Sequence, residues 1–112
     1  MGMITEVRGK EFVFPQEYSL KAYPNPFNPS TTIKYSLLKK SSVELKIYDI
    51  MGREIKAFSI NSQPAGYSEI NWDGKNEYGV LVSSGIYIYR IKFRAINDIQ
   101  IVEKSAKLVL TK

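Results

Sequence analysis

The sequence predicts an all-β fold, a sandwich of two antiparallel sheets. Six to eight short segments alternate between apolar and polar residues, and they recur roughly every ten residues along the chain. No segment has the apolar periodicity of a helix, and the eight Tyr and five Phe favour strands. With 112 residues, the chain is long enough for one domain with one core. A closed β-barrel is the alternative that this pattern leaves open.

The first predicted strand, residues 18–23, leads into a proline ribbon at residues 23–29 (Tyr-Pro-Asn-Pro-Phe-Asn-Pro). Proline fixes φ, lacks an N–H donor and disfavours the helical region for the residue before it. The ribbon is therefore stiff, and only an edge or a boundary of a sheet tolerates it. We interpret residues 1–17 as a vector remnant, Met1-Gly2-Met3, followed by a linker in which residues 12–14 can pair as a short edge strand.

The next strands are expected at residues 31–38 and 43–50, joined by a turn at residues 39–42. A returning strand at residues 54–60 completes a hairpin in which Gly52 supplies the positive φ of a tight turn. The residues expected to face inward are Ile33, Tyr35, Leu37, Val43, Leu45 and Ile47, and those expected to face water are Lys34 and Ser36.

Residues 61–66 have the composition of a loop, and a strand at residues 67–72 follows. This strand ends in Trp72, which we expect to anchor the core. Residues 73–79 contain two glycines and predict a second long turn.

The clearest strand spans residues 86–94, a turn follows at residues 97–98, and residues 99–111 supply the last strand or two. Aromatic and cationic residues alternate along residues 86–94, which superficially resembles a stacking platform for nucleic acid or sugar rings. The two kinds of side chain fall on opposite faces of one strand, so a core role is favoured for the aromatic ones. The expected inward residues are Tyr87, Tyr89, Ile91 and Phe93, and the expected outward ones are Arg90, Lys92 and Arg94.

The composition excludes several kinds of chemistry. The chain contains no Cys and no His, so disulfides, thiolate metal sites and His-dependent catalysis are excluded. The net charge of +5 is moderate and fits a solvated surface better than nucleic-acid binding. No apolar stretch approaches the roughly 18 residues needed to cross a bilayer. We therefore predict no catalytic, cofactor or metal residues, no nucleic-acid partner and no membrane insertion.

Oxygen-bearing side chains gather in the loop at residues 73–79, where Asp73, Asn76 and Glu77 could in principle bind Ca²⁺. Their spacing breaks the alternation of an EF-hand loop, and a plain turn is favoured. A carboxylate pair for glycoside cleavage would have to come from residues such as Glu69, Asp73 and Glu77, and the favoured interpretation is again a solvated surface.

Five motifs occur in order along the chain. They are Tyr-Pro-Asn-Pro-Phe-Asn-Pro-Ser-Thr-Thr-Ile at 23–33, Leu-Lys-Ile-Tyr-Asp-Ile-Met-Gly-Arg-Glu-Ile at 45–55, Ala-Gly-Tyr at 65–67, Trp-Asp-Gly-Lys-Asn-Glu-Tyr-Gly at 72–79 and Ser-Gly-Ile-Tyr-Ile-Tyr-Arg at 84–90. Together they resemble the C-terminal sorting domain, type A, of the type IX secretion (Por secretion) system of Bacteroidetes. That family in turn resembles the Ig-like domain of the flagellar hook-capping protein.

The resemblance implies an Ig-like β-sandwich of about seven strands over residues 18–112, placed after a covalently linked cargo domain. It also implies a secretion signal without catalytic activity, which directs the cargo from the periplasm through the translocon to the cell surface or the medium. A surface sortase would then cut the chain in the linker before Tyr18.

The candidate partner-binding residues form the basic and aliphatic run that ends the chain. From Arg90 onward there are six basic residues against two acidic ones. A partner's strand could add to the last strand as a sheet edge, with the lysines steering it to an acidic surface. Removal of residues 107–112 should then abolish export and leave the domain folded. The residues predicted to bind translocon or sortase components are Lys104, Lys107, Leu108, Val109, Leu110 and Lys112.

Two other functions remain open at this point. A carbohydrate-binding module of a polysaccharide-degrading enzyme would need exposed, coplanar aromatic rings, for which the candidates are Tyr18, Tyr67 and Tyr78. A structural spacer or assembly module would need no such site. A guarded, solvated edge strand is the plain structural alternative for the terminal lysines.

Overall fold

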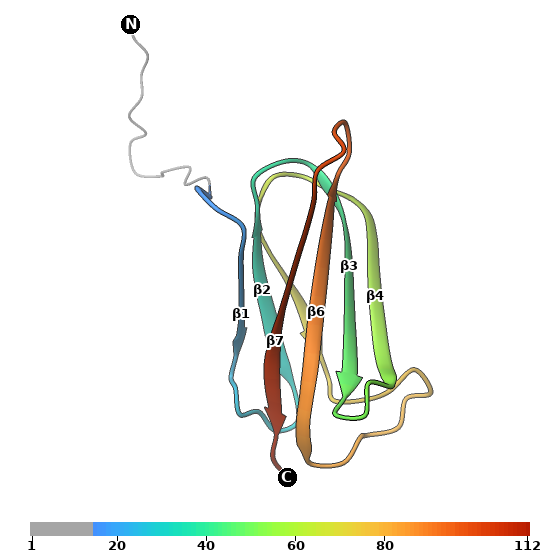
Figure 1. The fold of residues 1–112 in the computed structure, drawn as a ribbon. Coiled ribbons are helices and arrows are strands. Elements are labelled where there is room, and N and C mark those ends of the chain that lie inside the picture. Colours follow the sequence, from blue (N-terminus) through green and yellow to red (C-terminus); the bar gives the residue numbers. More distant parts are fainter. Residues whose placement is uncertain (1–14) are drawn as a thin grey trace, which may run out of the picture.

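The computed structural model describes residues 15–112, which form seven strands in two antiparallel sheets (Figure 1). One sheet has the order β1-β2-β5 and the other the order β4-β3-β6-β7. The predicted sandwich is therefore confirmed over a barrel. The expected strand at residues 12–14 lies outside the described residues. The strands are β1 (Ser19–Tyr23), β2 (Thr31–Leu37), β3 (Ser41–Asp49), β4 (Glu54–Gln63), β5 (Gly66–Trp72), β6 (Gly85–Ala95) and β7 (Ile101–Leu110).

The chain changes sheets three times, after β2, after β4 and after β5, so sequence neighbours face one another across the core (Figure 1). β2 is the central strand of the smaller sheet, and β3 and β6 are the central strands of the larger one. These strands carry the strongest alternation in the sequence, and all their predicted inward residues are buried. None of the described residues forms a helix that is long and apolar enough to cross a membrane.

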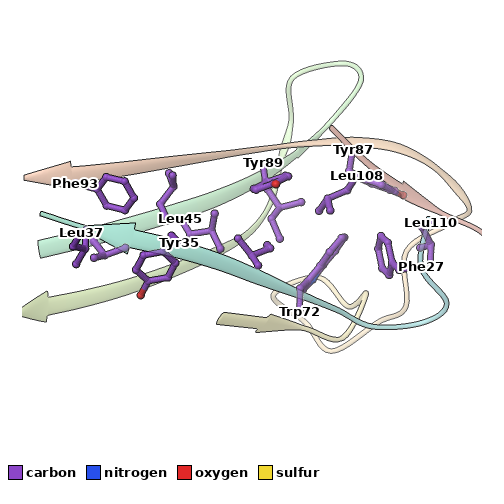
Figure 2. Packing of buried hydrophobic residues seen from close by; sticks show 14 residues of the cluster. Phe27, Tyr35, Leu37, Leu45, Trp72, Tyr87, Tyr89, Phe93, Leu108 and Leu110 are labelled. Atoms are coloured by element: carbon purple, nitrogen blue, oxygen red, sulfur yellow. The ribbon is translucent and has the colours of Figure 1, made fainter. Parts of the chain in front are cut away.

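Trp72 anchors the core, as predicted. Its side chain is fully buried and lies 5.5 Å from the ring of Phe27 and 5.7 Å, edge to face, from that of Tyr87 (Figure 2). Its indole N–H donates to the carbonyl of Lys75 at 2.9 Å, so this buried donor is satisfied. A Trp at the end of β5 thus joins the two sheets and the loop that follows.

Two details of the predicted β2 to β3 segment are wrong. Ser36 is buried, with 1% of its surface exposed, because its hydroxyl lies 2.6 Å from that of Ser19 and donates to the carbonyl of Glu17 at 2.7 Å. Ser41 belongs to β3 and not to the turn, and its hydroxyl donates to the carbonyl of Lys39 at 2.8 Å. Both serines look like surface residues by alternation or composition, yet each is covered by a hydrogen-bonding partner.

β4 is three residues longer than predicted, and the expected loop at residues 61–66 shrinks accordingly. A register shift in the ladder with β3 brings Gln63 opposite Ser41. The side chain of Gln63 accepts a hydrogen bond from the hydroxyl of Tyr35 at 2.9 Å. These contacts come from a neighbouring strand and from the opposite sheet, so local composition does not reveal them.

The proline ribbon lies against the outer edge of β7. The N–H of Phe27 donates to the carbonyl of Val109 at 2.8 Å, and the N–H of Thr111 donates to the carbonyl of Phe27 at 2.9 Å. The Asn25 side chain donates to the carbonyl of Lys107 at 2.8 Å and accepts from the N–H of Val109 at 2.9 Å. We call these four hydrogen bonds the ribbon clamp.

The ribbon also contributes to the core and contacts the loop after β5. Phe27 is buried between Trp72 and the end of β7 (Figure 2). The ribbon's carbonyl at Pro24 accepts a hydrogen bond from the hydroxyl of Thr31 at 2.7 Å. A Cβ at Gly74, which has φ +78°, would lie 2.6 Å from the carbonyl oxygen of Pro29. Glycine is therefore required where the loop closes on the ribbon.

The β3–β4 hairpin turns at Gly52, with φ 84°, as predicted. One carboxylate oxygen of Asp49 accepts from the N–H groups of Met51 and Arg53, each at 2.9 Å, and the other accepts from the Arg53 guanidinium at 2.8 Å. The hydrogen bond from the Arg53 N–H is the main cause that holds the pKa of Asp49 below its usual value. The charged form of Asp49 therefore stabilises the turn.

Asn25→Ala should lower the free energy of unfolding by about 1–2 kcal/mol, because it removes two hydrogen bonds of the ribbon clamp. Urea denaturation measures this difference. The matched control is Asn28→Ala, in an exposed ribbon residue outside the clamp, which should change stability by less than about 0.5 kcal/mol. Equal effects of the two substitutions would contradict a specific role for Asn25.

Deletion of residues 107–112 should abolish cooperative thermal unfolding, because it removes two buried leucines, Leu108 and Leu110. Each large truncation in a core costs about 2–5 kcal/mol, against a total stability of about 5–15 kcal/mol. The burial of these leucines thus argues against the expectation that the domain stays folded without this segment. Deletion of the exposed Lys112 alone is the control. A sharp melting transition in the variant that lacks residues 107–112 would show that the two leucines are not required for the fold.

Asp49→Asn should lower the melting temperature at pH 7, and the difference from the wild type should shrink as the pH falls below about 4. Because the folded-state pKa is depressed, the carboxylate stabilises the protein above its unfolded-state pKa, and this contribution disappears on protonation. Thermal melts between pH 2.5 and pH 7 provide the measurement. A difference that stays constant over this range would show that the charge of Asp49 is not the cause.

Candidate partner-binding surface at the C-terminal strand

The six predicted partner-binding residues divide into buried and exposed ones. Leu108 and Leu110 are core residues, with 0% and 1% of their surfaces exposed, and they lie close to Tyr87 and Phe27, respectively (Figure 2). On the folded domain their side chains are therefore not available to a partner. Val109 is half-buried, and the remaining three, Lys104, Lys107 and Lys112, are exposed. Their partner-binding role stays a prediction.

The three lysines do not form one basic patch. Lys104 is paired with Ile91 of β6 and shares the core-facing side of β7 with Leu108 and Leu110. Lys107 is paired with Ile88 and projects from the outer face of the sheet, and Lys112 lies beyond the end of β7. Since side chains alternate along a strand, a spacing of three residues places Lys104 and Lys107 on opposite faces. This rule could already have separated them at the sequence level.

The outer edge of β7 is only partly free. Its distal half, from Lys107 onward, is paired with the proline ribbon through the ribbon clamp. A partner's strand therefore cannot add to Val109 unless the ribbon leaves. This closed edge was missed at the sequence level because the two segments lie more than 80 positions apart.

The outer face of the larger sheet carries alternating charges. By strand register, Lys92 of β6 lies directly between Glu44 of β3 and Glu103 of β7. The Arg90 guanidinium lies 3.8 Å from the Glu103 carboxylate and 5.3 Å from the centre of the Tyr48 ring. The cations are thus interleaved with carboxylates, as on a solvated face. The buried positions of Tyr87, Tyr89 and Phe93 confirm the core role of the aromatic stripe.

A second interleaved cation is Lys46, whose ammonium group lies 3.9 Å from Glu44 and 3.5 Å from Glu54. The charge of Glu44 is the main cause that raises the pKa of Lys46. At the opposite end of the sandwich, Lys39 and Asp98 form an ion pair of 2.7 Å. Their hydrogen bond raises the pKa of Lys39 and lowers that of Asp98. These exposed pairs distribute charge over the surface, and such pairs contribute little to stability.

The oxygen atoms of the loop at residues 73–79 are used to build the turn. Asp73 accepts from the N–H of Lys75, and Asn76 accepts from the N–H groups of Tyr78 and of Val80, just after the loop. Glu77 reaches the edge of β4, where its carboxylate accepts from the N–H of Ala57 at 2.8 Å. Between residues 15 and 112, no group of three acidic residues has a geometry that could hold a metal ion.

The aromatic candidates for sugar binding lie in three different parts of the fold. Tyr18 stacks on Phe93 at 5.5 Å and is packed against the core. Tyr67, 62% exposed, lies on the outer face near the start of β5, whereas Tyr78, 89% exposed, lies in the loop beyond its other end. Coplanar rings are what a glycan platform needs, so this arrangement does not favour carbohydrate binding.

Comparison with solved structures shows the fold. A domain of dimeric latent PorU from Porphyromonas gingivalis matches with a TM-score of 0.68 and 22% identity over 92% of this chain and 10% of PorU. FlgD from P. aeruginosa matches with a TM-score of 0.59 and 22% identity over 71% of this chain and 61% of FlgD. PorZ of P. gingivalis, described as an essential surface component of the type IX secretion system, matches with a TM-score of 0.51 and 20% identity over 83% of this chain and 11% of PorZ.

The chain thus spans about a tenth of PorU and of PorZ. No curated protein matches its sequence. The model of the FlgD Ig-like domain family, however, matches residues 28–97, which is more than half of the chain. That range runs from the proline ribbon through β6 to the turn before β7. The predicted relationship to the hook-capping domain is confirmed, and the chain belongs to the FlgD Ig-like domain family.

Proposed function

We propose that this domain is the C-terminal sorting signal of a larger cargo protein, and that it directs this cargo across the outer membrane through the type IX secretion system. The observation that carries the proposal is the shared fold with PorU and with PorZ, of which the latter is a type IX surface component. The five ordered motifs in residues 23–90 support it independently.

The proposed role is recognition without catalysis. The chain has no His and no Cys, and its acidic loop side chains are engaged in turns and edge contacts. A rigid sandwich with its terminal segment packed into the core is suited to presenting a fixed surface. In this proposal the cargo precedes Tyr18, the sortase cuts ahead of it, and the mature cargo is secreted or stays at the cell surface.

In this proposal, the exposed residues of the terminal run act in recognition and its buried residues do not. Lys104, Lys107 and Lys112 are exposed and can meet translocon or sortase components, whereas Leu108 and Leu110 act by maintaining the fold. Long-range attraction between these cations and an acidic partner would raise the rate of encounter. We expect high ionic strength to weaken this steering.

A second candidate function is an assembly module, comparable to the domain in FlgD. The observation in its favour is the family match itself, since the solved FlgD of Xanthomonas campestris is described in terms of hook capping. An assembly module predicts no export that depends on type IX components. One experiment therefore separates the two functions.

A fluorescent reporter fused ahead of residues 1–112, behind a periplasmic leader, should reach the surface only in a host with an intact type IX translocon. Surface fluorescence and protease accessibility measure export, and the same host without the translocon is the control. The reporter without the domain should stay in the periplasm of both hosts. Periplasmic retention of the complete fusion in the competent host would overturn the sorting role and favour an assembly module.

A further inference from the structure

We propose that the proximal half of β7, residues 101–106, is the edge to which a protein of the export machinery adds an extended segment. This inference rests on the proposed sorting function and assigns its binding site. It differs from the expectation from sequence, which placed the contact in the terminal run. Three features of β7 support this different position of the contact. They are the direction of its backbone groups, the coverage of its distal half by the proline ribbon, and the side chains along residues 101–106.

The direction of the backbone groups follows from the ribbon clamp. The N–H and carbonyl of Val109, the carbonyl of Lys107 and the N–H of Thr111 all point away from β6, toward the ribbon. Residues along an antiparallel ladder alternate between groups directed to the partner strand and groups directed away from it. Glu103 and Ser105 therefore also direct their N–H and carbonyl groups outward.

These outward groups are accessible. Glu103 and Ser105 are both exposed, and among residues 15–112 no hydrogen bond engages their outward backbone groups. By contrast, the first part of the opposite edge strand, β4, contacts Glu77 through the carbonyl of Ile55 and the N–H of Ala57. Within residues 15–112, the proximal half of β7 thus has no hydrogen-bonding partner for its outward backbone groups, whereas the distal half of β7 and the first part of β4 have one, and β1 of the other sheet lies beside β7.

The side chains beside this open edge indicate the chemistry of the partner. On the core-facing side, Lys104 stands between Val102 and Ala106, which pack against the core. On the outer side, Lys107 is exposed, whereas Glu103 lies near Arg90, 3.8 Å away. The complementary segment is extended, with small apolar residues on one side and carboxylates placed to meet the two lysines.

Lys104 also affects whether a partner protein or a second copy of the chain can pair with this edge. A lysine that projects from the inner side of an edge strand opposes pairing with a second copy, because it would need a desolvated place in the joint sheet. A partner segment with a carboxylate opposite Lys104 removes this desolvation penalty. The charge pattern therefore favours a partner with acidic residues over self-association.

Ser105→Pro tests the edge directly, because it removes an outward N–H and leaves the ladder with β6 unchanged. Ser105→Ala is the matched control, since it removes the hydroxyl and keeps the N–H. In the reporter fusion, we expect export of Ser105→Pro to fall by about tenfold or more, and export of Ser105→Ala to equal that of the wild type. The melting temperature of the complete 112-residue chain should stay within a few degrees for both variants.

The outcomes separate the two proposals. Export of Ser105→Pro at the wild-type level, with the fold intact, would overturn the edge assignment and leave the sorting function standing. Failure of the wild-type fusion to be exported would instead overturn the sorting function, and the edge assignment with it. If Ser105→Pro unfolds, the double variant Lys104→Glu/Lys107→Glu decides: reduced export of a folded protein supports the proposal, and unchanged export overturns it.

Sedimentation of the 112-residue chain tests whether a second copy of the chain binds the β7 edge instead. We expect a monomer for the wild type and for Ser105→Pro. A wild-type dimer that Ser105→Pro dissociates would assign the edge to a second copy and overturn the proposed partner.

Discussion

The ribbon clamp is the interaction on which the rest of this structure depends. It joins Asn25 and Phe27 to the last strand, more than 80 residues later, through four hydrogen bonds. The same ribbon places the Phe27 ring against Trp72 in the core. Because three prolines stiffen the ribbon, few conformations are lost when it docks. The stiffness of the ribbon and the burial of Phe27 therefore stabilise the same closed arrangement.

The clamp also determines which part of the sheet edge a partner can reach. The distal half of β7 is covered by the ribbon, and the beginning of β4 is covered by Glu77. The outer face between these edges interleaves cations with carboxylates, as in the pair of Lys46 with Glu44 and Glu54. Such covered edges and mixed charges oppose unspecific strand pairing. Selective recognition at the proximal half of β7 is compatible with this protection.

The Ig-like sandwich by itself does not determine what the domain does. The same fold occurs in FlgD, in PorU and in PorZ, which are proteins with different descriptions. What distinguishes one such domain from another is its exposed surface. Under the function proposed above, the exposed lysines near the proximal half of β7 are the recognised feature of this chain, and the buried terminal leucines support the fold that presents them.

Local sequence patterns were enough to predict the strands, most of the inward residues, the hairpin at Gly52 and the anchor Trp72, because side-chain alternation and turn chemistry are local properties. Three features became visible only in the folded domain: Ser36 is buried, β4 extends to Gln63, and Glu77 covers an edge. The folded domain also shows that the terminal run, residues 104–112, contributes to the core, to the contact with the proline ribbon and to the exposed surface. Each of these features depends on a partner distant in the sequence, and local alternation carries no information about which distant residue that partner is.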